Sequence, residues 1–303
     1  MTNLNNLRVF YAVAKLQSFT RAAEELCLTQ PGISKHIKQL EEYYETRLFD
    51  RLGRKVMLTR AGEILFAATR DIFYLIDEAK IKIDELKGLV GGKLRIGGSF
   101  TIATYILPAI MGKFKTKYPG IEINLDISLS REIAGKVLEN TLDIGFLGAP
   151  VSDERLITKQ FLSDELVVVV PLGHEWAERR SVRPCELADK PYIMQKKGSG
   201  TRAIVEKKLE LEGIVLKKTM EFGNTETVKK AVEAGLGISI LSKHVITREV
   251  RAGLLKSVFL SETELKRSLY LAYHKDKYIT KAAEAFIALC QCKETDFRAE
   301  SEK

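Results

Sequence analysis

The sequence of 303 residues has little cysteine and histidine, four of each. The cysteines are widely separated, except for one Cys-Gln-Cys pair whose two cysteines are too close in sequence for the usual zinc-binding spacing. The histidines are equally scattered, with no second ligand at a useful spacing. We therefore expect reduced thiols rather than a disulfide framework, and neither a metal site nor a cofactor. The four cysteines are Cys27, Cys185, Cys290 and Cys292.

Long apolar runs are also missing. No window approaches the roughly 18 uncharged apolar residues of a membrane span. The N-terminus, MTNLNNLRVF, lacks the basic run and hydrophobic core of a secretory signal. We expect a cytoplasmic protein without a membrane partner.

Signatures of catalysis are incomplete. The Lys197 to Gly200 segment lacks the first glycine of a nucleophile elbow, and VGGKLRIGG does not have the G-x-G-x-x-G spacing of a dinucleotide site. In an α/β enzyme, aspartates at strand ends can be catalytic, although such residues are more often caps or turn residues. Three occur here: Asp126, Asp143 and Asp164. An α/β enzyme therefore stays the disfavoured alternative.

The composition is that of a globular protein, with 45% hydrophobic and 29% charged residues. The length allows two or three domains, each with its own core. A formal charge of +8 is compatible with nucleic acid binding and equally with ordinary solubility. Charge alone therefore does not decide the function.

The first 58 residues have a compact helical pattern. Apolar residues from Leu7 to Ala14 recur at spacings of three and four and predict one helix. Ser18 can cap a short second helix over Phe19 to Leu26. Thr29 can cap a third helix, in which Pro31 falls in the first turn and its missing N–H is harmless.

The third helix has two different faces. Ile33, Ile37, Leu40 and Tyr44 share the face that packs inward, whereas donors and cations lie on the other face. A short helix, a tight connection and a helix of this kind match a helix-turn-helix, whose second helix enters the major groove. The alternative is an ordinary solvated helix face. The candidates for the groove are Thr29, Gln30, Pro31, Ser34, Lys35 and Lys38.

Two short extended pieces follow, in LFDRLGRKVMLT. A Gly-Arg-Lys turn between them predicts a β-hairpin wing that carries cations. Such cations can contact phosphate without reading sequence, and the candidates are Arg51 and Arg54.

Residues 59–90 predict one long helix without proline. An apolar stripe of this length, with nothing in the segment to cover it, favours pairing with the same helix of a second copy. The alternative is a helix packed on its own domain. The stripe consists of Leu65, Ala68, Ile72, Leu75, Ala79, Ile83 and Leu86.

Glycines 88, 91 and 92 mark the start of the remaining domain, in which apolar runs alternate with helical stretches. This alternation predicts an α/β fold with mainly parallel sheets, and two such sheets would enclose a cleft for a small ligand. Three helix starts there could bind an anion through free N–H groups, although each taken singly reads as a simple cap. Their residues are Ser99 and Thr101; Gly198, Ser199, Gly200, Thr201 and Arg202; and Thr225, with Asn224 or Thr225 as the third cap.

The stretch LRVFYAVAKLQSFTRAAEELCLTQPGISKHIKQLEEYYETRLFDRLGRKVMLTRAGE resembles the winged helix-turn-helix of LysR-type transcriptional regulators, nearly position by position. The resemblance implies a winged helix-turn-helix over 1–58, a linker and dimerisation helix over 59–90 and a two-lobed effector domain over 91–303, similar to type 2 periplasmic binding proteins. Lobe one would cover about 91–161 and 267–303, and lobe two about 162–266.

It also implies a homodimer or homotetramer that binds double-stranded promoter DNA, responds to a small effector and is not an enzyme; contact with RNA polymerase stays open. A detached periplasmic binding protein is disfavoured by the attached DNA-binding head.

The segments GSGTR and EAGLGISIL resemble the subset of the family that regulates sulfur assimilation and carbon fixation. This resemblance implies a small anionic effector such as sulfite, sulfate or a phosphate-like oxyanion; the alternative is a sugar phosphate or another larger metabolite. The chain departs from the subset at Phe100, where relatives often have threonine, and at Lys196 and Lys197. The phenyl ring would narrow the pocket, and the lysines would raise its positive potential.

Overall fold

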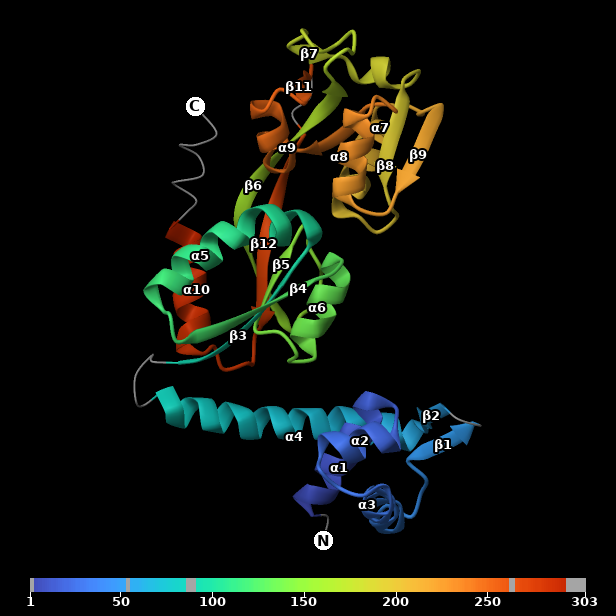
Figure 1. Cartoon of the computed structure of the whole chain (residues 1–303), viewed down its shortest axis with the longest axis vertical. Helices are drawn as coiled ribbons and strands as arrows, with labels where there is room; N and C mark the ends of the chain where they lie inside the picture. Colours follow the sequence, from blue (N-terminus) through green and yellow to red (C-terminus); the bar gives the residue numbers. More distant parts are fainter. Residues whose placement is uncertain (1–2, 53–54, 86–90, 262–264, 293–303) are drawn as a thin grey trace. The chain divides into compact units, whose positions relative to one another are not determined.

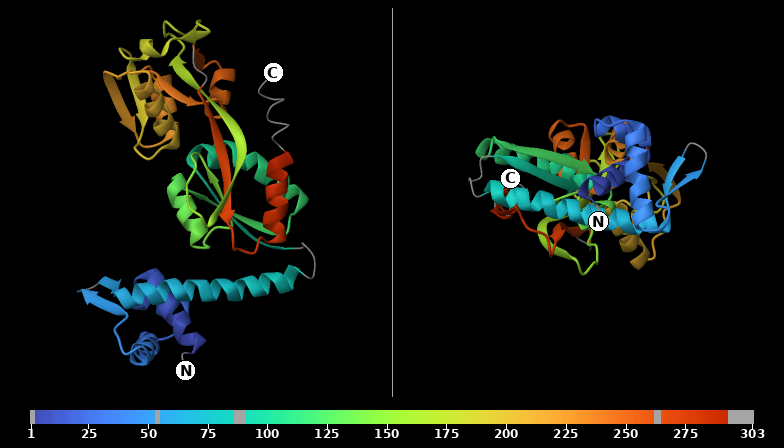
Figure 2. Two further views of the ribbon diagram at one scale, coloured as in Figure 1. Left: turned by 180° about the vertical axis from the view of Figure 1, so that it is seen from behind. Right: turned by 90° about the horizontal axis from the view of Figure 1, so that it is seen from below.

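The computed structural model describes residues 3–52, 55–85, 91–261 and 265–292 (Figures 1 and 2). The chain forms two compact units, Met1–Leu86 and Lys87–Lys303. In the described part of the chain, none of the helices combines the length and the apolar character needed to cross a membrane.

The N-terminal unit contains the predicted three helices, hairpin and long helix. Its elements are α1 (Leu4–Leu16), α2 (Phe19–Glu25), α3 (Gln30–Tyr43), β1 (Phe49–Leu52), β2 (Lys55–Leu58) and α4 (Arg60–Glu85). Side chains at Asn3, Ser18 and Thr29 cap the first three helices, each by accepting a hydrogen bond from a backbone N–H of the first turn.

The core of this unit is built from the inward faces of α1, α2 and α3. Phe10, Ile33 and Leu40 are fully buried, and the ring of Phe10 lies 5.3 Å from that of Phe49 at the start of the hairpin. Gly62 is required where α4 crosses the chain before the hairpin, because a Cβ there would lie 2.1 Å from the carbonyl oxygen of Leu48.

Helix α4 divides into two halves. In the first half, Leu65 is buried in the core, and Phe66 and Phe73 lie 5.2 and 5.7 Å from the ring of Tyr11 on α1. This half packs on its own unit, as the alternative interpretation had it. From Ile72 onward, where Phe73 makes the last of these contacts to α1, the apolar side chains of Ile72, Leu75, Ile76, Ile81 and Ile83 are exposed.

The second unit consists of two lobes joined by two long strands (Figure 1). The joining strands are β6 (Leu156–Pro171) and β12 (Lys266–His274). The first lobe contains β3 (Gly92–Gly98), η1 (Ile102–Ile106), α5 (Leu107–Lys117), β4 (Ile121–Ile127), α6 (Ser130–Leu138), β5 (Ile144–Leu147) and α10 (Lys281–Cys292). The second contains β7 (Ser181–Val182), η2 (Pro184–Leu187), β8 (Pro191–Gln195), α7 (Gly200–Leu211), β9 (Lys218–Phe222), α8 (Thr225–Glu233), β10 (Ser239–Ser242), α9 (Lys243–Arg251) and β11 (Leu255–Leu260).

The α/β class is as predicted, but the expectation of mainly parallel sheets is wrong for the central strands. Strand β3 pairs in parallel with β4 and β5, and β8 pairs in parallel with β9. Strand β6, in contrast, is antiparallel to β10, β11 and β12, and β12 is antiparallel to β5. The reason is that the chain passes between the lobes twice, in opposite directions, so the two crossing strands must pair antiparallel.

The crossing strands change their surroundings along their length. Phe161 and Leu162 of β6 pack in the core of the first lobe, whereas Leu166 and Val168 pack in a core of the second. The register of β12 against β6 shifts between Leu269 and Tyr270. A β-bulge of this kind bends a strand locally, here near the middle of the crossing.

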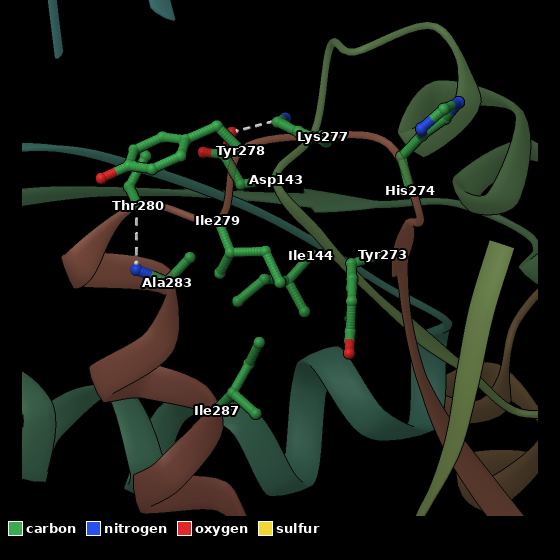
Figure 3. A pocket seen from close by; sticks show the side chains of 10 residues that line it. All are labelled: Asp143, Ile144, Tyr273, His274, Lys277, Tyr278, Ile279, Thr280, Ala283 and Ile287. Atoms are coloured by element: carbon green, nitrogen blue, oxygen red, sulfur yellow. Dashed lines mark hydrogen bonds and ion pairs between the residues drawn. The ribbon is translucent and has the colours of Figure 1, made fainter. Parts of the chain in front are cut away.

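A pocket in the first lobe has the buried side chains of Asp143 and Lys277 in its lining (Figure 3). Asp143 accepts hydrogen bonds from the backbone N–H of Arg95 at 2.7 Å and from its Nη2 at 2.8 Å, and from Nζ of Lys277 at 2.8 Å. Burial raises the pKa of Asp143, but the Arg95 hydrogen bonds and the charge of Lys277 outweigh it, so the pKa lies below its ordinary value. The group ties β3, β5 and the segment before α10 together, which is a structural role.

Asp143→Asn is expected to lower the free energy of unfolding by about 3 kcal/mol near neutral pH, because it leaves the buried ammonium of Lys277 and the partly exposed guanidinium of Arg95 without their counter-ion. A carboxylate with a lowered pKa stabilises above its unfolded value of about 3.9 and loses that contribution as the pH falls through the folded value. The difference between wild type and variant in urea unfolding should therefore shrink as the pH falls from about 5 to about 3. An unchanged difference over this range would show that the Asp143 charge is not the source of the stability.

Candidate functional site

The outward face of α3 is the first candidate site. Thr29 caps the helix through a hydrogen bond from the backbone N–H of Gly32 at 3.3 Å, and Pro31 lies in the first turn. Gln30, Pro31 and Lys35 are exposed, and Ser34 is half-buried. The helix start therefore presents donors and a cation, as a major-groove contact requires.

Lys38 also lies on this face, and its side chain is 77% exposed. Its Nζ is 3.6 Å from Oε1 of Glu42 one turn along, a spacing at which exposed ion pairs contribute little. Phosphate would have to compete with Glu42 for Lys38. Lys35 has no acidic residue one turn later on α3 with which it could pair, because the residue four positions later is Gln39.

The orientation of α3 depends on a contact that sequence reasoning missed. Asn6 of α1 bonds through Oδ1 to Nδ1 of His36 at 2.8 Å, and its Nδ2 donates to Oε1 of Gln39 at 3.2 Å. Local sequence does not distinguish His36 from the other scattered histidines. The only available signal was that His36 and Gln39 lie three residues apart, and this spacing puts both on one side of the helix.

The predicted wing is present as a hairpin. Strands β1 and β2 pair antiparallel from Phe49 opposite Leu58 to Leu52 opposite Lys55, and Arg51 lies opposite Val56. Arg54 lies outside the described residues.

The second candidate site lies where helix starts from both lobes meet. Ser199 is the N-cap of α7 and accepts a hydrogen bond from the backbone N–H of Arg202. Asn224 caps α8 by accepting from the N–H of Thr227 at 2.9 Å, so Asn224, and not Thr225, is the third cap. The helical stretch from Phe100 continues into η1, a π-helical segment of a kind often found at functional sites, and η1 has no side-chain cap.

Gly148, which follows β5, brings two of these starts together. A Cβ on Gly148 would lie 3.0 Å from Oγ of Ser99, and a Cβ on Gly200 would lie 3.2 Å from the carbonyl oxygen of Gly148. The N–H of Gly148 also donates to Oγ of Ser130 at the start of α6, at 3.0 Å. Ser99 and Gly200, which belong to different lobes, thus both lie next to Gly148. Gly148 and Ser130 were not predicted, because nothing in their local sequence marks them.

The third helix start is connected through Tyr105 of η1. Its hydroxyl bonds to Glu226 in the first turn of α8, and Lys229 pairs with Glu226 at 3.0 Å and with Glu249 of α9 at 2.9 Å. Burial and the Glu226 carboxylate raise the pKa of Tyr105, so it stays a neutral donor. Thr225, beside Glu226, and Thr101 on the helical stretch that contains η1 are both buried.

Arg202, predicted as an effector ligand, is paired within its own lobe. Its Nη1 donates to the carbonyl oxygen of Gln195 at 2.8 Å and to Oε2 of Glu221 at 2.6 Å, and its Nε donates to Oε1 of Glu206 at 2.7 Å. The guanidinium holds α7 to the ends of β8 and β9. Two carboxylates already neutralise it, which weighs against a direct contact to an anion. Thr201 is buried, and Gly198, at a φ of 89°, forms the turn before Ser199.

Two family descriptions together cover nearly the whole chain. The bacterial regulatory helix-turn-helix of the lysR family matches residues 4–63, and the LysR substrate binding domain matches residues 87–293.

Known proteins agree. The RuBisCO operon transcriptional regulator of Acidithiobacillus ferrooxidans is 37% identical over 284 residues, 94% of this chain and 92% of the relative. A full-length OxyR variant of Pseudomonas aeruginosa has the same fold, with a TM-score of 0.74, 23% identity and coverage of 97% of this chain and 95% of that one. The CcmR regulatory domain of Synechocystis PCC6803, solved in complex with 2-PG, is 29% identical, with a TM-score of 0.63, and covers 68% of this chain and 98% of the domain.

The chain is therefore a member of the LysR family of transcriptional regulators.

Proposed function

We propose that the outward face of α3 reads promoter DNA in the major groove, that α4 joins two copies, and that the cleft of the second unit binds a small phosphate-like anion. Each element of the proposal has its own support. The donors at the start of α3 are exposed, and the second half of α4 exposes an apolar stripe with no cover from the described residues of its own unit.

The meeting of Ser99 and Gly200 at Gly148 carries the effector part of the proposal. Helix N-termini attract anions, and here a start from each lobe borders the same backbone, so one small ligand could touch both lobes. A ligand with contacts to both lobes favours one lobe arrangement over others.

A relative supports this class of anion. The Synechocystis CcmR domain binds 2-PG, 2-phosphoglycolate, which carries a phosphate and a carboxylate. The position of Phe100 beside Ser99 supports a ligand of this small size. Sulfite and sulfate are smaller oxyanions, and the same donors could bind them. A homotetramer and a contact with RNA polymerase stay predictions.

Thermal unfolding of the full chain with 2-phosphoglycolate, sulfate, sulfite or phosphate tests this proposal. A ligand at a hundredfold excess over its Kd adds about 2.7 kcal/mol, which raises the Tm of a domain of this size by roughly 5 to 10 °C. We expect a shift with at least one of these anions and its loss in Ser99→Ala.

Thr116→Ala is the matched control, because it removes an exposed hydroxyl at the far end of α5. It should keep the full shift. If no anion shifts the wild type, the helix starts are ordinary caps and the anionic effector is wrong. A shift that survives in Ser99→Ala would move the site away from Gly148.

A further inference from the structure

A buried ion pair lies where the two crossing strands leave the second lobe. Arg267 of β12 is opposite Asp164 of β6, and its Nε donates to Oδ2 of Asp164 at 2.7 Å. The two side chains are only 4% and 0% exposed. Oδ1 of Asp164 accepts a hydrogen bond from Oγ of Ser242, just before α9, at 2.7 Å. These contacts fix the orientation of the guanidinium.

The rest of the guanidinium faces the start of α7. Nη1 of Arg267 donates to Oγ1 of Thr201 at 2.9 Å. Nη2 is bonded to the same carbon as Nη1 and therefore lies beside it. Nη2 is buried and finds no acceptor among the residues that the structure describes. Buried donors of a charged group are rarely left without an acceptor, so this one needs an explanation.

A second buried donor in this region also has no acceptor among the described residues. Nε2 of Gln195 is unpaired, and the residue is 5% exposed. Gln195 is the last residue of β8, and the turn that leads to α7 follows it. In α/β folds, ligands bind at the carboxyl ends of parallel strands such as β8 and β9. Gln195 thus precedes the turn, and Arg267 contacts Thr201 just after it.

The chemistry of the missing partner follows from these donors. Nη2 can only donate, and it carries part of a positive charge, so an acceptor with negative charge would bind it most strongly. Oxygens of a phosphate, sulfate or carboxylate meet this requirement. The carboxylate of Asp164 would repel an anion bound beside it. The positive N-terminal end of α7 must therefore help Arg267 to stabilise the anion.

We propose that Arg267 is a direct ligand of the anionic effector. Nη2 binds one oxygen of the anion, while Nε stays on Asp164 and Nη1 on Thr201. The inference rests on the proposed function and adds a residue that local sequence did not mark. It also places the ligand on a crossing strand, so binding acts on the connection between the lobes.

Calorimetric titration of the full-length protein with 2-phosphoglycolate and with sulfate tests the role of Arg267. Arg267→Lys keeps a cation against Asp164 but loses the fork of donors. Since a hydrogen bond between charged groups contributes about 1.5 to 3 kcal/mol, the affinity for the anion that the wild type binds should fall about 10- to 100-fold.

Arg95→Lys is the control in the first lobe, because Arg95 of β3 also pairs with a buried aspartate, Asp143, although its own side chain is 37% exposed. It should bind the anion like the wild type. If Arg267→Lys does not fold, Asp164→Leu combined with Arg267→Met replaces the pair by apolar side chains, a change that buried pairs often tolerate. This double variant should also lose the anion.

The outcomes separate the two proposals. A variant at Arg267 that binds the anion as tightly as the wild type overturns the role of Arg267 and leaves the anionic effector in place. A wild type that binds promoter DNA but neither anion overturns both.

Discussion

Replacement of both Ile76 and Ile83 of α4 by glutamate is expected to convert the protein from an oligomer into a monomer and to abolish tight binding to a two-half-site promoter. The two side chains are 44% and 61% exposed and lie seven residues apart on one face of the helix. Sedimentation of the variant at micromolar concentration measures the assembly, and a gel shift measures the binding.

The size of this effect follows from the number of groups involved. In a pair of α4 helices each change occurs twice, so four carboxylates would enter an apolar seam. Loss of one buried isoleucine already removes about 2 to 5 kcal/mol, and an unpaired buried charge adds more. We therefore expect a dissociation constant of the dimer at least about 100-fold higher.

Ile81→Glu is the control on the opposite side of the same helix, about 150° from Ile76 and Ile83 at roughly 100° per residue. It introduces the same charge at a side chain that is 36% exposed, and the protein should remain an oligomer. If the Ile76 and Ile83 variant stays an oligomer as well, the second half of α4 is not the interface.

The second large effect is expected at the start of α3, where Gln30→Ala and Lys35→Ala should behave differently. If Gln30 contacts a base edge, its loss weakens binding to the specific site by about 1 to 3 kcal/mol per half-site and leaves binding to random DNA nearly unchanged. If Lys35 contacts phosphate, its loss weakens binding to all DNA and lowers the salt slope by about 0.9 per contact.

Affinities for the promoter and for random DNA, measured over a range of salt concentrations, distinguish the two roles. Lys38→Ala should behave like Lys35→Ala with a smaller effect, because Glu42 already pairs with Lys38. Equal losses on both kinds of DNA for Gln30→Ala would place Gln30 on the backbone instead of a base.

Sequence alone was sufficient where local signals decide the structure. The three N-terminal helices follow from apolar spacing and from caps at Ser18 and Thr29, both of which the structure contains. The direction of β6 was not predictable in this way, because a run such as LVVVV shows burial without showing which strands will flank it. The pairing of β6 with β10, β11 and β12 depends on the path of the whole chain.

The same distinction holds within the candidate site. Ser199 and Asn224 were accessible as caps from local sequence, and both act as caps. Arg202 was selected because it lies next to Thr201 in the sequence, yet Glu206 and Glu221 pair with it. Arg267 reaches Thr201 from 66 residues away, a proximity that only the folded chain creates.

The close approach of Gly62 to the Leu48 carbonyl oxygen limits how α4 can be placed on the N-terminal unit. Helix α4 has 26 residues and so forms a lever about 39 Å long. A tilt of about 5° at its Gly62 end would displace the far end by about 3.4 Å, which is one base step along a strand. Because a Cβ at position 62 would collide with the Leu48 carbonyl oxygen, a substitution of Gly62 would have to shift the start of α4 against the chain before the hairpin, and the length of the helix would enlarge that shift at its far end.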